Sequence, residues 1–196
     1  MMQSLLADIK KCTLCLPSLP QGVNPVISAN EKSKIAIIGQ APGSVVHRTG
    51  IPWDDKSGER LRLWLDVTKE EFYNKDLFAL IPMGFCYPGK GKSGDLPPRP
   101  ECAPKWHEAV FSQLQELEII LLIGTYAQQY YLQEAMKKTL TGTVQAFEEY
   151  LPRYFPLPHP SPRNNIWLKK NPWFEQITLP ELKRRVHPLT EPGRNT

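Results

Sequence analysis

KIAIIGQAPG, residues 34–43, is the stretch that decides the fold of this 196-residue chain. A continuous apolar run that ends at a glycine is typical of a parallel strand buried on both faces. Three further short apolar runs, at 77–81, 119–123 and 154–157, predict three more strands. The run at 119–123, IILLI, is the most hydrophobic of them.

The segments around these strands predict helices. The predicted helices cover residues 2–11, 57–67, 104–117, 126–135, 143–150 and 173–186, with a long loop at 87–104. Strands that alternate with helices indicate an α/β fold, here a three-layer α/β/α sandwich around a central, mainly parallel four-stranded sheet. The length of the chain suits a single domain, residues 1–196.

Composition narrows the class of protein. With 41% hydrophobic and 22% charged residues, the chain is not expected to be disordered. A net charge of +4 is compatible with a nucleic-acid partner without requiring one. No apolar run approaches the roughly 20 residues of a membrane span, and the N-terminal segment lacks the form of a signal peptide. We therefore expect a soluble, cytoplasmic protein that has no membrane partner and is a monomer by default.

Three segments are expected to meet at one edge of the sheet. In open parallel sheets, ligands bind past the carboxyl ends of the strands. The segments that follow the first, second and fourth predicted strands are GQAPG, PMGFCYPG and PHPSPRNN. In the first of these, the turn formed by Gln40, Ala41, Pro42 and Gly43 lets backbone N–H groups approach a ligand carbonyl or a phosphate, although many strand-to-loop turns are similar.

The segment at 50–58, GIPWDDKSG, carries an aromatic side chain and two carboxylates. Trp53, on a Gly/Pro loop, is suited to stack on a flat base, or it fills the core. Asp54 and Asp55 are candidates to orient a water molecule. The alternative is that Asp55 or Ser57 caps the helix that follows.

His159 lies between two prolines, after the fourth predicted strand. A stiff backbone suits a group that must donate a hydrogen bond to developing negative charge. The alternative is a loop histidine with a structural hydrogen bond. His47, His107 and His187 lack such a frame, and we assign them no role.

Four cysteines form a C-x2-C pair, Cys12 and Cys15, followed after a long gap by Cys86 and Cys102. In a reducing compartment such a set indicates metal binding or catalysis before disulfides. Four thiolates are the usual ligands of a cubane iron–sulfur cluster, and they also hold structural zinc. Zinc ribbons usually have two close pairs, whereas this chain has one. Unrelated buried cysteines are the third interpretation.

Taken together, these segments resemble the uracil-DNA glycosylase superfamily, and most closely its iron–sulfur branch. That branch carries GEAPG, GRPFVGRAG and HPS motifs, which here read GQAPG (39–43), GIPWDDKSG (50–58) and HPSPRN (159–164). The four cysteines also follow the spacing pattern of its 4Fe–4S cluster ligands. The resemblance runs from Cys12 to Trp173.

The resemblance implies a DNA glycosylase that hydrolyses the N-glycosidic bond of a flipped-out uracil or other deaminated base in damaged DNA. By position, Trp53 stacks on the base and His159 stabilises negative charge as the base departs. Ser161 and the backbone near it grip a DNA phosphate, and Arg163 occupies the place of a wedge residue. The cluster is expected to order the loops around 87–104, and the resemblance implies no redox role for it.

Two residues depart from the family pattern. Gln40 replaces a glutamate, and an amide cannot act as a general base, so Asp54 or Asp55 is the expected substitute. Pro82 replaces the asparagine that reads the edge of uracil, and proline offers neither a side-chain hydrogen bond nor an N–H. Asn164 or Asn165 is a candidate to supply that amide.

These departures motivate a second hypothesis, a superfamily member that binds DNA with little or no base release. A third hypothesis, from another class, is a structural zinc or iron–sulfur module that has no role on DNA.

Overall fold

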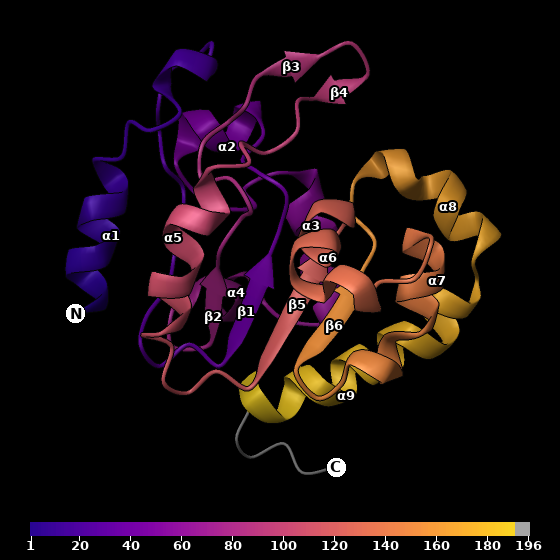
Figure 1. The fold of residues 1–196 in the computed structure, drawn as a ribbon. Helices are drawn as coiled ribbons and strands as arrows, with labels where there is room; N and C mark the ends of the chain where they lie inside the picture. The colour runs from indigo at the N-terminus through magenta and orange to yellow at the C-terminus, as the bar shows by residue number, and fades with distance from the viewer. Residues whose placement is uncertain (191–196) are drawn as a thin grey trace.

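The central sheet has four parallel strands in the order β2-β1-β5-β6. A computed structural model describes residues 1–190, so the last six residues of the predicted domain, 191–196, lie outside the described residues. The strands are β1 Ile35–Ile38, β2 Phe78–Leu80, β5 Ile119–Ile123 and β6 Tyr154–Leu157. All four were predicted within one or two residues of these bounds, and the parallel sheet is confirmed (Figure 1).

Helices surround the sheet (Figure 1). Their bounds are α1 Met2–Lys10, α2 Ser44–Thr49, α3 Lys56–Leu65, α4 Lys69–Tyr73, α5 Cys102–Phe111, α6 Thr125–Leu132, α7 Leu140–Gln145, α8 Asn165–Lys170 and α9 Leu179–Thr190. Short 3-10 turns lie at Leu16–Ser18, Gln133–Ala135, Phe147–Tyr150 and Pro162–Asn164, and one π-helical turn, Phe174–Thr178, leads into α9.

Two hydrophobic cores lie on opposite faces of the sheet. Successive residues of a strand point to opposite faces, so Ile35 and Ile37 of β1 join one core while Ala36 and Ile38 join the other. The first core packs against α3, α4, α7 and α9, and the second against α1, α5 and α6. The predicted three-layer sandwich is therefore confirmed.

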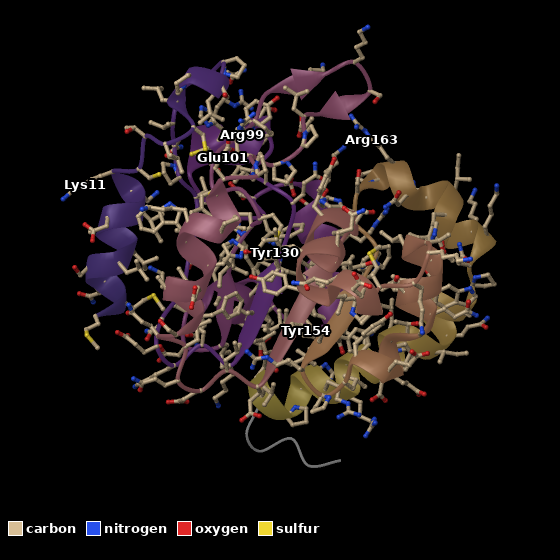
Figure 2. The ribbon with its side chains drawn as sticks, in the orientation of Figure 1. Lys11, Arg99, Glu101, Tyr130, Tyr154 and Arg163 are labelled. Atoms are coloured by element: carbon tan, nitrogen blue, oxygen red, sulfur yellow. The ribbon has the colours of Figure 1, made fainter. Side chains whose placement is uncertain are left out.

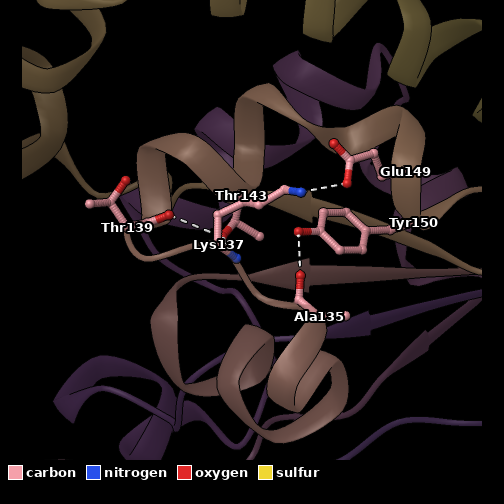
Figure 3. Close-up of polar contacts among 6 residues, drawn as sticks. All are labelled: Ala135, Lys137, Thr139, Thr143, Glu149 and Tyr150. Atoms are coloured by element: carbon pink, nitrogen blue, oxygen red, sulfur yellow. Dashed lines mark hydrogen bonds and ion pairs between the residues drawn. The ribbon is translucent and has the colours of Figure 1, made fainter.

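Polar contacts connect the turns of the segment between α6 and β6 (Figure 3). The Tyr150 hydroxyl donates to the carbonyl of Ala135 at 2.9 Å, and the backbone N–H of Lys137 donates to Thr143 Oγ1 at 3.1 Å. The Lys137 ammonium also pairs with Glu149. These contacts hold the turns between α6 and β6 to one another. The predicted helix at 143–150 is wrong in its bounds, because α7 ends at Gln145 and a 3-10 turn continues to Tyr150.

Three helices, α2, α4 and α8, and one hairpin were not predicted. Residues after GQAPG form α2 instead of continuing as a loop, and α4 begins at a capping box in which Thr68 and Glu71 satisfy each other's backbone N–H groups. Inside the predicted loop 87–104 lies a hairpin, β3 Lys90–Gly91 paired antiparallel with β4 Gly94–Asp95. Two-residue strands are too short for an alternating pattern to appear in the sequence.

None of the helices within residues 1–190 combines the length and the apolar character that a membrane crossing requires.

Candidate functional site

A cleft of about 410 Å³ opens at the carboxyl edge of the sheet. It is lined by residues that follow β1, β2 and β6, by the segment before α3, and by the β3–β4 hairpin. The arrangement confirms the predicted convergence of three segments at one edge. The sequence-predicted candidates in the lining are Gln40, Ala41, Pro42, Gly43, Trp53, Asp55, Pro82, His159, Ser161, Arg163 and Asn164.

His159 is held in one orientation by its own loop. Its Nδ1 accepts a hydrogen bond from the backbone N–H of Ser161 at 3.2 Å, and its carbonyl accepts one from Asn164 Nδ2 at 2.7 Å. Because Nδ1 is an acceptor, the neutral ring carries its proton on Nε2. Within residues 1–190, Nε2 has no hydrogen-bond partner, so it is the nitrogen available to a ligand in the cleft.

The charge state of His159 follows from its surroundings. Burial lowers the pKa of the imidazole, while the negative charges of Asp55 and Asp95 partly oppose that change. Burial disfavours the charged form of a histidine because the imidazolium loses its hydration. The ring is therefore neutral at neutral pH, and it offers an N–H donor rather than a positive charge.

Trp53 is fixed beside His159. Its ring centroid lies 5.8 Å from that of the imidazole, at an interplanar angle of 32°. The indole passes so close to Gly39 that a Cβ there would lie 2.7 Å from its Cζ2, and a Cβ on Gly58 would collide with the Trp53 carbonyl. Trp53 itself has a φ of 58°, an uncommon conformation for a large side chain. Trp53 also packs against the first core, as one of the two sequence interpretations predicted, and it lines the cleft.

The two neighbouring carboxylates lie in different places. Asp55 lines the cleft and caps α3, where its Oδ1 accepts from the backbone N–H of Gly58 at 2.8 Å. The predicted cap is therefore confirmed. Asp54 is not among the residues that line the cleft. Its charge acts instead on Tyr73, whose pKa is raised first by burial and further by Asp54.

Pro82 lines the cleft, and its carbonyl is hydrogen-bonded to the ring of His107. His107 Nε2 lies 3.0 Å from that carbonyl, and Nδ1 lies 2.6 Å from the Tyr131 hydroxyl. The ring is buried and stacks against Phe85 at 5.6 Å, and burial lowers its pKa to about 4. This role could not be predicted from the sequence, because the partners of His107 are distant along the chain.

Arg163 and Ser161 connect the cleft to other elements. Arg163 Nη1 donates to the carbonyl of Ser93 at 3.2 Å, and its guanidinium lies against Gly94, where a Cβ would lie 2.3 Å from Nη1. Figure 2 shows this side chain reaching from the start of α8 toward the hairpin. The Ser161 carbonyl accepts from Arg60 at 3.1 Å. In this conformation the guanidinium holds the hairpin rather than standing free as a wedge.

A sequence model of the uracil DNA glycosylase superfamily matches residues 27–183. The chain belongs to the uracil DNA glycosylase superfamily. The match includes all four strands of the sheet and every residue that lines the cleft except Val26. Membership supports a DNA glycosylase-like function and DNA as the partner.

Asp95 is a carboxylate in the cleft lining of this superfamily member that the sequence analysis did not single out. It ends the β3–β4 hairpin, and a Cβ on Gly43 would lie 3.5 Å from its Oδ2. The buried hydroxyl of Tyr87 donates to Oδ1 at 3.4 Å. A carboxylate in a Gly-rich loop was visible in the sequence, but its place in the cleft depends on the hairpin.

Outside the cleft, this superfamily member has a second pocket, lined by Cys12, Cys15, Cys86 and Cys102. Of these, Cys12 and Cys15 precede the residues that the family match covers. Cys102 Sγ accepts from the backbone N–H of Phe85 at 3.3 Å, and Arg99 and Glu101 pair beside Cys15 (Figure 2). All four cysteines are free thiols. Among residues 1–190, no three His, Cys, Asp or Glu side chains are grouped as ligands of a single metal ion.

Proposed function

We propose that this protein is a DNA glycosylase that hydrolyses the N-glycosidic bond of a flipped-out uracil or another deaminated base. The observation that carries the proposal is His159, whose Nδ1 is occupied and whose Nε2–H is available in a cleft at the carboxyl edge of the sheet. A neutral imidazole that is fixed before the substrate arrives can stabilise charge as it develops, without reorganising.

The proposed chemistry is cleavage in which the base leaves with the electron pair of the glycosidic bond. Negative charge then develops on the base, and the sugar takes on oxocarbenium character. His159 donates a hydrogen bond to the departing base, and Trp53 stacks on its flat face. The constrained approach of Trp53 to Gly39 fixes where that stacking surface lies.

The other lining residues of the motifs have proposed roles toward DNA. The backbone N–H groups of Ala41 and Gly43, together with the Ser161 hydroxyl, are suited to bind the base or a phosphate. Asn164 already donates one amide hydrogen to the His159 carbonyl, so its first role is to hold the loop. We also propose that the chain acts as a monomer.

Base release tests the proposal. The wild-type protein is incubated with labelled single- and double-stranded oligonucleotides that contain uracil, hypoxanthine, xanthine or a mismatch, and abasic sites are then cleaved with alkali. We expect cleavage at one or more deaminated bases. Absence of cleavage at every lesion, by a folded protein that binds the same DNA, would contradict the proposal.

A second candidate function, DNA binding without efficient base release, is favoured by Gln40 and Pro82. An amide at the first position cannot accept a proton from water, and proline at the second cannot read a base edge. This candidate predicts salt-dependent binding with no abasic product, and Gln40→Glu together with Pro82→Asn would then restore cleavage.

We propose that the four cysteines hold a 4Fe–4S cluster, as in the iron–sulfur branch, with structural zinc as the alternative. The donor set fits, because four thiols from three separate segments line one pocket and a backbone N–H already points at the sulfur of Cys102. A cubane cluster holds its thiolates farther apart than one tetrahedral zinc ion does. The proposed contribution of the cluster is to tie the N-terminal segment to α5 and to the loop after β2.

Anaerobic purification, followed by a visible spectrum and metal analysis, distinguishes a 4Fe–4S cluster from structural zinc. We expect a brown protein with about four iron atoms, the content of a cubane cluster. A colourless protein that contains one zinc ion would contradict the cluster and leave the proposed reaction untouched.

A further inference from the structure

The cleft contains a carboxylate that no motif supplies. Asp95 reaches it from the β3–β4 hairpin, whose base is closed by a hydrogen bond from the Leu96 N–H to the Gly89 carbonyl at 2.8 Å. Its Oδ2 faces Gly43, the last residue of the turn that begins the site. Asp95 thus lines the same cleft as Gln40 and lies within the electrostatic reach of His159.

Hydrolysis of a glycosidic bond needs a group that orients and deprotonates water. Gln40 lines the cleft but cannot accept the proton. Asp55 also lines it, yet its Oδ1 is held by the Gly58 N–H at the start of α3, where the helix dipole further stabilises the carboxylate. Asp54 lies outside the lining. Among the lining residues, Asp95 is the remaining carboxylate, and no backbone N–H engages it.

We propose that Asp95 is the catalytic carboxylate that activates the attacking water, in place of the residue at position 40. This inference rests on the proposed glycosylase function. The water oxygen bonds to C1′ of the deoxyribose, and the glycosidic bond breaks with its electron pair on the base nitrogen. The water proton passes to the Asp95 carboxylate and then to solvent, and the departing base anion takes a proton from solvent.

An ordinary carboxylate suffices for this role. The sugar carries positive charge in an oxocarbenium-like transition state, so the water needs little activation, and the negative charge of Asp95 stabilises the sugar directly. Two contacts position it. The Tyr87 hydroxyl donates to Oδ1 at 3.4 Å, and Arg163 holds the hairpin through the Ser93 carbonyl and the face of Gly94. Arg163 and Tyr87 are accordingly positioning residues for Asp95.

The test measures single-turnover base release on the lesion that the wild-type protein cleaves fastest. The variants are Asp95→Asn, the double variant Asp95→Asn with Gln40→Glu, and Glu148→Gln. Glu148 is exposed and remote from the cleft lining, so its substitution removes one negative charge without touching the site. The Kd for the same DNA is also measured for each protein. A variant that has lost only water activation should still bind this DNA as tightly as the wild type does.

We expect Asp95→Asn to release base about 100-fold more slowly, within the usual range for general-base catalysis, while its DNA affinity is no weaker. A carboxylate at position 40 should restore about tenfold or more of that loss, which a merely structural role of Asp95 would not allow, and Glu148→Gln should match the wild type. Wild-type release that persists unchanged in Asp95→Asn would overturn this inference alone. No release by the wild-type protein at any lesion would overturn the proposed function and this inference with it.

Discussion

The cleft around His159 and the packed region around His107 use the same side chain in two ways. Burial lowers the pKa of both imidazoles, so both are neutral at neutral pH. Both also carry their proton on Nε2, because Nδ1 accepts from Ser161 in one and from Tyr131 in the other. The difference is the partner of Nε2, which is the Pro82 carbonyl for His107 and a ligand site for His159.

This difference separates a structural histidine from a functional one. A buried polar group costs free energy unless it is hydrogen-bonded, and His107 meets that requirement within the protein. His159 leaves its Nε2–H open at the cleft, and we propose that this donor serves the substrate. Burial and a shifted pKa are common to both, so neither property alone identifies the site.

The largest expected effect is on chemistry. His159→Ala should slow single-turnover base release by about 10³-fold, because one preorganised donor to the leaving group is lost, while DNA binding and the free energy of unfolding change little. His187→Ala, which removes only a surface contact with Asp66, is the control and should match the wild type. Full activity in His159→Ala would contradict the role given to its Nε2–H.

The next effect is on stability. His107→Ala should lower the free energy of unfolding by about 3 kcal/mol, because a buried stacked ring is removed and the Tyr131 hydroxyl loses its acceptor. Urea denaturation measures the change. Tyr131→Phe, which keeps the ring and removes only the hydroxyl, should lose about 1 kcal/mol. Two variants as stable as the wild type would show that the region is not tightly packed.

The pH dependence of stability sharpens the comparison. His107 has a pKa of about 4 in the folded protein, below the ordinary value of 6.5. The unfolded chain therefore binds a proton first, so stability that is present above pH 6.5 is lost as the pH falls toward 4. This residue should account for a loss of about 2 kcal/mol between pH 7 and pH 5. Urea denaturation at several pH values gives the free energy of unfolding as a function of pH, and its decrease between pH 7 and pH 5 should be smaller in His107→Ala. The same decrease in the variant and the wild type would contradict a lowered pKa of His107.

The smallest effect concerns the cap. Asp55→Ala should lower the free energy of unfolding by about 1 kcal/mol, because the Gly58 N–H loses its acceptor at the start of α3. Asp55→Ser restores a capping oxygen without the charge and should recover most of the loss. Thermal denaturation compares the two variants with the wild type. If both were equally destabilised, the charge of Asp55 in the cleft would matter more than its capping oxygen.

Features that depend on neighbours in the sequence could be predicted, and those that depend on distant contacts could not. The four strands were evident from short apolar runs, and the order of the sheet placed three motifs at one edge. The role of His107 could not be predicted, because Pro82 and Tyr131 lie on different elements. Asp95 enters the cleft only through a hairpin that is too short to leave an alternating pattern.

Adjacent residues show the same limit. Asp54 and Asp55 were equivalent as water-orienting candidates in the sequence, and only the direction of the chain before α3 separates them. Trp53 both packs against the first core and lines the cleft, two locations that the sequence treated as alternatives.

The availability of His159 can be measured directly by long-range ¹H–¹⁵N NMR of the histidine rings between pH 5 and pH 8. At pH 7 we expect His159 to be neutral with its proton on Nε2, and that N–H signal to shift when DNA containing the cleaved lesion, or its abasic product together with the free base, is added. The His107 signals should stay unchanged in the same titration. A His159 ring that is charged at pH 7, or that carries its proton on Nδ1, would contradict the central claim that the cleft keeps a neutral Nε2–H donor for the departing base.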